Sequence, residues 1–425
     1  MIKLNKVHFQ NSGKKILYDY TPINHVQKYF HLNHSYYVKY DIDVSETPNS
    51  ILVIPFISNV ITIAWFAGFD VEVSEVDEDY YNALKLIKIE FQKQFPDYKL
   101  NGNLIAKHII KNKINGNNCA MLFSGGVDAY ATYIRIHDKK ADLVTILGAD
   151  IEIEDKSQWK SFTNFIEKEK LLELNNKQYI ETNVRDFYTY QVHLLLKDMG
   201  WWGKVQHGLS LIGVLAPISY INKYSSIYIA SSYTDQIDIA WGSTPSIDEK
   251  IKWAGIQVFH DGYELKRQDK VDLITKFSKN TNNQFRLRVC YSELRTGFNC
   301  SHCEKCYRTI LGIILNGENP NNYGFKVDKN IYKDIFKILE SGGASKGMQY
   351  FWWELMEKAK ISESIYIFEN KVIENIELNR IRNGEIHNLL EKKINNPKRL
   401  LTKVKFVLKN RFENIYNYYI KIRYN

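Results

Sequence analysis

The chain has 425 residues, more than a single core usually organises, so we expect two or three domains. Hydrophobic residues make up 44% and charged residues 25%, which is ordinary for a soluble globular protein and excludes a low-complexity chain. The formal charge of +9 suits an anionic ligand such as a nucleotide, although charge alone identifies none. Met1–Lys6 lacks the apolar segment of a signal peptide, so a cytoplasmic location is expected.

The pattern of residues 1–100 predicts a separate, strand-rich module, in which a helix at Tyr80–Gln94 follows the strands. The expected strands cover residues 36–44, 51–57, 60–66 and 69–73. Within this module, Ser50–Phe69 carries no charge and is long enough to span a bilayer. Pro55 and the polar residues at 58, 59 and 62 interrupt it, so we interpret it as a buried hairpin turning at Ser58-Asn59, and we expect no membrane span.

From Asn118 onward, apolar strands alternate with helical segments. The expected strands cover residues 119–123, 143–147, 178–181, 226–230 and 286–290, and the expected helices cover 129–137, 159–174, 187–199 and 208–222. Such alternation predicts a parallel sheet with helices on both faces, here over residues 101–320.

Residues 321–425 predict a helical, basic extension. Its last part, Lys392–Asn425, is rich in Lys and Arg and contains one acid, Glu413. Between residues 398 and 412 the basic side chains are interleaved with Leu, Val and Phe at helical spacing, giving an apolar stripe with a basic flank. Such a helix packs on its own protein or docks on a protein partner, RNA or an anionic membrane surface, and we expect a macromolecular partner here.

The most informative local motif lies between an apolar strand and a helix. It reads Phe123-Ser124-Gly125-Gly126-Val127-Asp128-Ala129. Two glycines let the backbone approach a phosphate, and the helix N-terminus that follows directs N–H groups to the same place. The Ser124 hydroxyl can add a donor, and Asp128 can orient the loop or hold Mg²⁺. The motif resembles the SGGxDS loop of PP-loop ATPases, which implies cleavage of ATP to AMP and pyrophosphate; the family's final serine is Ala129 here.

Four of the five cysteines form a second motif. They are Cys290, Cys300, Cys303 and Cys306, whereas Cys119 lies in an expected strand. CxxC turns place sulfurs close enough to share one ion, and four thiolates fill a tetrahedral zinc site completely. This spacing predicts a closed, structural zinc site, with an iron–sulfur cluster as the alternative.

The phosphate loop and the cysteine site, in this order, resemble the 7-cyano-7-deazaguanine synthase family of queuosine biosynthesis over roughly residues 118–318. The resemblance is to a divergent, longer branch of the kind found in bacterial antiviral defence loci. It implies an adenine nucleotide alpha hydrolase type of Rossmann-like fold, with ATP, Mg²⁺ and Zn²⁺ as cofactors. It also implies a ligase that adenylates the carboxylate of 7-carboxy-7-deazaguanine. Ammonia then gives an amide and possibly a nitrile, or the acyl group passes to another amine, including one on a protein.

Further candidate residues follow the ends of the expected strands, where open α/β sheets bind ligands. The candidate nucleotide contacts are Gly148 and Asp150, the additional catalytic candidate is His207, and the candidate substrate contacts are Ser231, Ser232, Trp241, His260 and Asp261. Trp241 could stack on a flat heterocycle, and Asp261 could pair with a guanine-like edge. Arg267 and Lys270 could contact phosphate or lie on a solvated helix face.

Two other function classes remain open at this stage. An RNA-modifying PP-loop enzyme fits the basic tail, although a complete four-cysteine site leaves no paired catalytic cysteine for thiolation. A non-catalytic nucleotide-binding sensor fits the replacement at Ala129.

Overall fold

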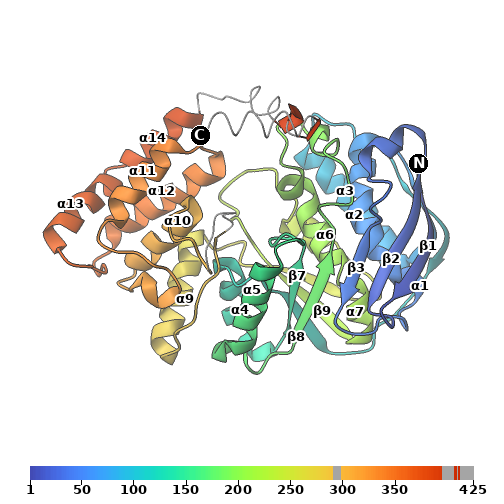
Figure 1. Ribbon diagram of the computed structural model, residues 1–425, viewed down its shortest axis with the longest axis horizontal. Coiled ribbons are helices and arrows are strands. Elements are labelled where there is room, and N and C mark those ends of the chain that lie inside the picture. Colours follow the sequence, from blue (N-terminus) through green and yellow to red (C-terminus); the bar gives the residue numbers. More distant parts are fainter. Residues whose placement is uncertain (291–297, 395–405, 409, 412–425) are drawn as a thin grey trace.

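The computed structural model describes residues 1–290, 298–394, 406–408 and 410–411, and its described strands form one ten-stranded sheet (Figure 1). The sheet order is β10-β9-β6-β7-β8-β3-β2-β1-β4-β5. The strands are β1 (Ile2–Gln10), β2 (Lys15–Pro22), β3 (Tyr37–Tyr40), β4 (Val71–Asp77), β5 (Leu104–Ile110), β6 (Asn118–Leu122), β7 (Asp142–Leu147), β8 (Lys177–Thr182), β9 (Tyr224–Ala230) and β10 (Gln257–Asp261). The predicted α/β class is confirmed.

The α-helices cover both faces of the sheet and form a separate layer of their own at the C-terminal side. They are α1 (Asn49–Leu52), α2 (Ile54–Ala67), α3 (Glu78–Gln94), α4 (Val127–Arg135), α5 (Lys156–Lys168), α6 (His207–Gly213), α7 (Ala216–Ile221), α8 (Pro245–Asp248), α9 (Arg267–Thr281), α10 (Glu304–Ile314), α11 (Ile331–Ser341), α12 (Lys346–Ile361), α13 (Lys371–Arg382) and α14 (Glu385–Ile394). Helices α10 to α14 lie to the left of the sheet in Figure 1, so the predicted helical C-terminal part is confirmed.

Strands β6 to β10 make the parallel half of the sheet. Their side chains alternate between two cores, as the two-residue repeat of a strand requires. On β7, Val144 and Ile146 join the core that contains α2 and α6, while Leu143 and Leu147 join the core that contains α4, α5 and α10. Burial on both faces is typical of parallel strands that are covered by helices, as the alternation of strands and helices predicted.

The N-terminal 100 residues share this sheet. The antiparallel pair β3–β8 joins them to the parallel half, with Val38 opposite Thr182. Their core is also shared, since the Tyr40 hydroxyl donates to the Val214 carbonyl oxygen at 2.9 Å. The strands drawn in blue in Figure 1 therefore continue the sheet that carries the phosphate loop. The strands of residues 1–100 are hydrogen-bonded neighbours within this one sheet.

The predicted hairpin in Ser50–Phe69 is wrong, because this segment forms α1 and α2. Residues 54–65 are all buried, so α2 is enclosed by protein around its whole circumference and shows no solvent-facing polar stripe. Pro55 lies in the first turn, where a helix tolerates it, and Ser58 and Asn59 bond to the hydroxyls of Tyr80 and Tyr36. Within the described residues, no helix is long and apolar enough to cross a membrane.

Three further expectations differ from the structure. Residues 286–290 are extended but form no strand, because Val289 and Cys290 donate their N–H groups to the Asn299 side chain at 3.0 and 3.3 Å. The helix expected at 187–199 is reduced to a short 3₁₀ turn at His193–Leu195. Most of the basic segment at 392–425 lies outside the described residues, and its predicted role stays a prediction.

Candidate functional site

The loop between β6 and α4 has the shape of a phosphate cradle. Gly125 has φ +72°, a left-handed backbone conformation that is strained for residues with a side chain. An added Cβ would also lie 3.0 Å from the Phe162 ring. Gly126 is the N-cap of α4 and has no side-chain cap, so the first N–H groups of the helix are left for a ligand. The Arg288 N–H bonds to the Gly125 carbonyl at 2.7 Å and holds the loop in place.

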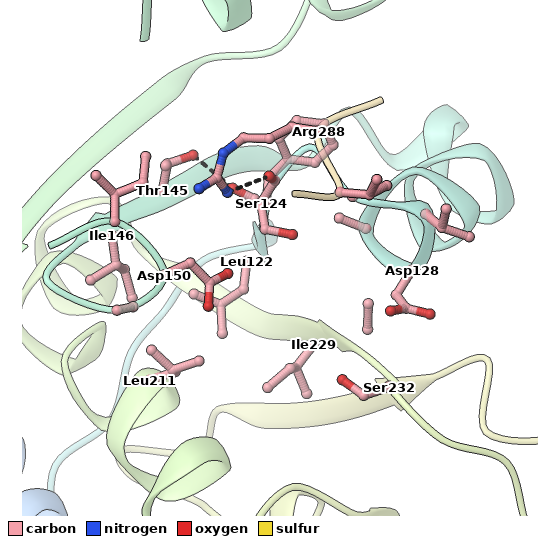
Figure 2. Close-up of a pocket in the computed structure, with 18 of the residues that line it drawn as sticks. Leu122, Ser124, Asp128, Thr145, Ile146, Asp150, Leu211, Ile229, Ser232 and Arg288 are labelled. Atoms are coloured by element: carbon pink, nitrogen blue, oxygen red, sulfur yellow. Dashed lines mark hydrogen bonds between the residues drawn. The ribbon is translucent and has the colours of Figure 1, made fainter. Parts of the chain in front are cut away.

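A cavity opens beside this loop, at the carboxyl ends of β6, β7 and β9 (Figure 2). About 930 Å³ of space, part of it open to solvent, lies among its lining residues. Figure 2 shows Ser124, Asp128, Asp150 and Ser232 around this space, and aliphatic side chains such as Ile229 and Leu211 line it as well; the lining aliphatic residues are called the apolar floor. The floor comprises Leu122, Val144, Ile146, Leu211 and Ile229. Apolar walls with a few convergent polar groups are typical of a small-molecule site.

Asp128 is the centre of a buried ion cluster. Its two carboxylate oxygens lie 2.9 Å from Arg267 Nη2 and 3.3 Å from Lys270 Nζ. Burial alone would raise the pKa of this carboxyl, but the charges of Arg267, then Lys270 and Lys305, outweigh burial and hold it below its ordinary value. Asp128 is therefore ionised at neutral pH, and both its oxygens are already engaged by cations.

The cluster contains more positive than negative charge. Arg267, Arg288 and Lys305 all line the cavity beside Asp128. Lys270 is almost fully buried and also donates to the Ser231 carbonyl oxygen at 2.6 Å. Burial, followed by the neighbouring Arg267, lowers the pKa of Lys305 to about 7. An excess of buried cations next to a glycine loop suits a polyanion such as a nucleotide phosphate chain.

His207 and Asp150 form a second polar corner of the cavity. His207 follows a π-helical turn, Trp202–Gln206, a rare conformation that is frequent at functional sites. Its ring lies 5.5 Å from that of Trp202 and 5.7 Å from that of Trp241, and burial lowers its pKa. The imidazole is therefore neutral at pH 7 and able to accept a proton. Asp150 has no ion-pair partner within the described part of the chain.

Gly148, a predicted nucleotide contact, lies outside the cavity lining and allows the loop after β7 to turn. Its φ is +97°, and a Cβ there would lie 1.8 Å from the Thr182 carbonyl oxygen. Only glycine allows the chain to turn at this point, and the turn carries Ala149 and Asp150 into the cavity lining.

Only one of the five predicted substrate contacts lies in the cavity lining. Ser232 lines the cavity, whereas Ser231, Trp241, His260 and Asp261 do not. Asp261 accepts bonds from Thr132 Oγ1 at 2.8 Å and Arg135 Nε at 3.1 Å, so it fastens α4 to β10 and is not directed at a ligand.

His260 and Trp241 are also engaged elsewhere. His260 Nδ1 lies 2.8 Å from Asp248 Oδ2, and both side chains are fully buried. The Trp241 ring packs so closely on Gly203 that a Cβ there would lie 2.6 Å from it. Trp241 also lies beside the His207 ring, so it supports His207, while His260 is held by Asp248.

The four cysteines converge as predicted. Their Sγ atoms lie within 4.8 Å of one another, with 3.8 Å between Cys290 and Cys303 and 3.8 Å between Cys300 and Cys306. Zinc–sulfur bonds of about 2.3 Å in a tetrahedron require sulfurs about 3.8 Å apart, so the group fits one metal ion. The Cys303 N–H lies 3.2 Å from the Cys300 sulfur, a bond typical of thiolate ligands.

The cysteine site adjoins the cavity at two points. Arg288 and Val289, which immediately precede Cys290, line the cavity. Lys305, between Cys303 and Cys306, lines it from α10. A metal at the four sulfurs would therefore hold both segments against the phosphate loop. Arg288 and Lys305 were not singled out in the sequence, although their positions beside the cysteines could have indicated them.

Comparisons of the chain with models of protein families, with curated proteins and with solved structures find no match.

Proposed function

We propose that the chain is an ATP-using enzyme that activates a carboxylate as an adenylate. The observation that carries this proposal is the glycine loop at Ser124–Asp128, which opens α4 beside a cavity with one cationic wall and an apolar floor. The cations suit the phosphates, and the aliphatic floor suits an adenine ring. The loop lacks the Gly-Lys-Ser/Thr element of a Walker A motif, so cleavage between the α- and β-phosphates is proposed, releasing AMP and pyrophosphate.

Two cofactor assignments accompany this activity. Zinc is proposed at the four cysteines, because tetrahedral thiolate sites select it. For Mg²⁺ we favour Asp150 over Asp128, since Asp128 is already paired with Arg267 and Lys270 whereas Asp150 faces the cavity. Carboxylate oxygens are the ligands that Mg²⁺ prefers.

The proposed substrate is 7-carboxy-7-deazaguanine, on the resemblance of the motifs. His207 is proposed to accept the proton of the attacking amine, because its imidazole is neutral and lies in the cavity lining. The attack releases AMP and gives an amide, or an acylated amine on a protein. A nitrile would require a second ATP to activate the amide for loss of water. A nucleotide sensor is the second candidate, because the Ala129 methyl group lies in the cavity lining where a hydroxyl would donate to phosphate.

Incubation with ATP, Mg²⁺ and 7-carboxy-7-deazaguanine is expected to yield AMP and pyrophosphate, measured by phosphorus NMR, and an amide or nitrile detected by mass spectrometry. Gly125→Ala is expected to reduce AMP formation by roughly a hundredfold, because it strains the loop at φ +72° and crowds Phe162. Gly255→Ala is the matched control, since Gly255 has φ +82° but open space around its Cβ position. Formation of ADP would refute the loop assignment, and bound but uncleaved ATP would favour the sensor.

A further inference from the structure

Helix α12 lies in the C-terminal helical part, outside the segment that carries the family resemblance, yet it contacts Arg267 of the cavity lining and the nearby Arg308. The Arg308 guanidinium lies 4.4 Å from the centre of the Phe351 ring, and the Arg267 guanidinium lies 5.3 Å from it. Tyr233 stacks on the same ring at 5.4 Å with an interplanar angle of 15°. One aromatic side chain of α12 therefore touches an arginine from α9 and another from α10.

Two other residues of α12 fasten it to the same two helices. Trp352 Nε1 donates to Glu304 Oε1 at 3.0 Å, and that oxygen also lies 2.7 Å from Arg308 Nε in the first turn of α10. Glu354 accepts the backbone N–H of Gln268 at 3.1 Å in the first turn of α9. The starts of α9 and α10, which carry Arg267 and Lys305, are thus held together from the C-terminal side.

The Phe351 ring contacts two guanidinium groups of like charge, those of Arg267 and Arg308. Each guanidinium group also has a carboxylate partner, since Arg308 Nε lies 2.7 Å from Glu304 Oε1 and Arg267 Nη2 lies 2.9 Å from Asp128 Oδ2. The negative face of an aromatic ring attracts guanidinium groups without cancelling their charge, as a carboxylate would. The Phe351 ring therefore adds an uncharged contact to these two ion pairs, and Arg267 remains in the cavity lining.

We propose that α12 completes the site: Phe351 positions Arg267 of the cavity lining, with Arg308 against the same ring, as a subsite for the polyphosphate chain of the nucleotide. The ligand class is an oligophosphate, bound as the β- and γ-phosphates of ATP or as free pyrophosphate. Phe351 is a positioning residue, because it acts through the two arginines. This inference rests on the proposed function, since it requires that the cavity binds a nucleotide.

Isothermal titration calorimetry with ATP, AMP and inorganic pyrophosphate tests the proposal. Phe351→Leu removes the ring but keeps an apolar side chain, and it is expected to weaken ATP and pyrophosphate binding roughly tenfold while leaving AMP binding within about twofold. Phe351→Tyr keeps the ring face and should restore both affinities. Arg308→Gln probes the same subsite from α10 and should show the same selectivity even if Phe351→Leu does not fold.

Phe336→Leu is the matched control, because Phe336 has the same exposure as Phe351, 7%, and also lies under an arginine, Arg380, at 3.9 Å. It should lower thermal stability without changing any of the three affinities. Equal losses for AMP and ATP in Phe351→Leu, or unchanged pyrophosphate binding in both test variants, would overturn the positioning role. Failure of the unmodified protein to bind ATP would instead contradict the proposed function itself.

Discussion

Cys303→Ala is expected to yield protein that carries no metal and no longer binds ATP. Three thiolates cannot close a tetrahedral site, and structural zinc contributes on the order of 10 kcal/mol to folding in small domains. Here the effect should extend to the ligand cavity, because Arg288 precedes Cys290 directly and Lys305 lies between Cys303 and Cys306. Elemental analysis, circular dichroism and nucleotide titration on the same preparation would measure metal content, folding and binding together.

Cys119→Ala is the control, since Cys119 lies on β6 and is not part of the four-sulfur group. It should retain about one zinc per chain and normal nucleotide affinity. Iron in the unmodified protein would refute the zinc assignment. Full ATP affinity in metal-free Cys303→Ala would show that the cysteine site and the cavity are independent.

The two motifs were predictable from the sequence because their geometry is local. In the phosphate loop, a strand end, two glycines and a helix start fix the backbone within a few residues. In the cysteine site, three of the four sulfurs lie within seven residues of one another along the chain, from Cys300 to Cys306. Neighbouring residues set both arrangements, so distant parts of the fold were not needed to recognise them.

The cationic wall was less predictable, because it is assembled from three separate segments. Arg267 begins α9, Arg288 lies in an extended segment, and Lys305 is on α10. Their spacing along the chain contains no pattern that brings them together. The same reason explains Phe351, which reaches the cluster only because α12 packs against α9 and α10.

The helix α2 was misread for a different physical reason. Its apolar residues include four isoleucines and a valine, which favour strands, and Ser58-Asn59 has the composition of a turn. Complete burial overrides both signals, because a helix surrounded by protein needs no polar face and its polar side chains can bond to buried hydroxyls. Residues 1–100 looked like a separate module in the sequence because their link to the rest of the sheet is not local. The pairing of β3 with β8 joins residues about 140 apart, and no short sequence pattern indicates it.

Asp150→Asn and Asp128→Asn are expected to fail in different ways, although both side chains face one cavity (Figure 2). Asp150 forms no salt bridge with another described residue, although its charge acts on Lys305 and His207, so its variant should keep most of its stability. It should form AMP roughly a hundredfold more slowly, because an amide holds Mg²⁺ less well than a carboxylate. AMP formation measured against Mg²⁺ concentration checks this, and an unchanged rate would remove Asp150 from the metal assignment.

Asp128→Asn should lower the free energy of unfolding by roughly 3–5 kcal/mol at pH 7, because Arg267 and Lys270 lose their buried partner. Its pH dependence distinguishes this cause. Although burial alone would raise the pKa of Asp128, Arg267 and Lys270 hold it below its ordinary value. Its stabilisation is therefore complete above the unfolded pKa of about 4 and is lost as pH falls through the lower, folded pKa. Urea unfolding of both proteins should show a constant difference above about pH 5 that shrinks below about pH 4. A difference that does not change with pH would mean that the carboxylate charge does not stabilise the cluster.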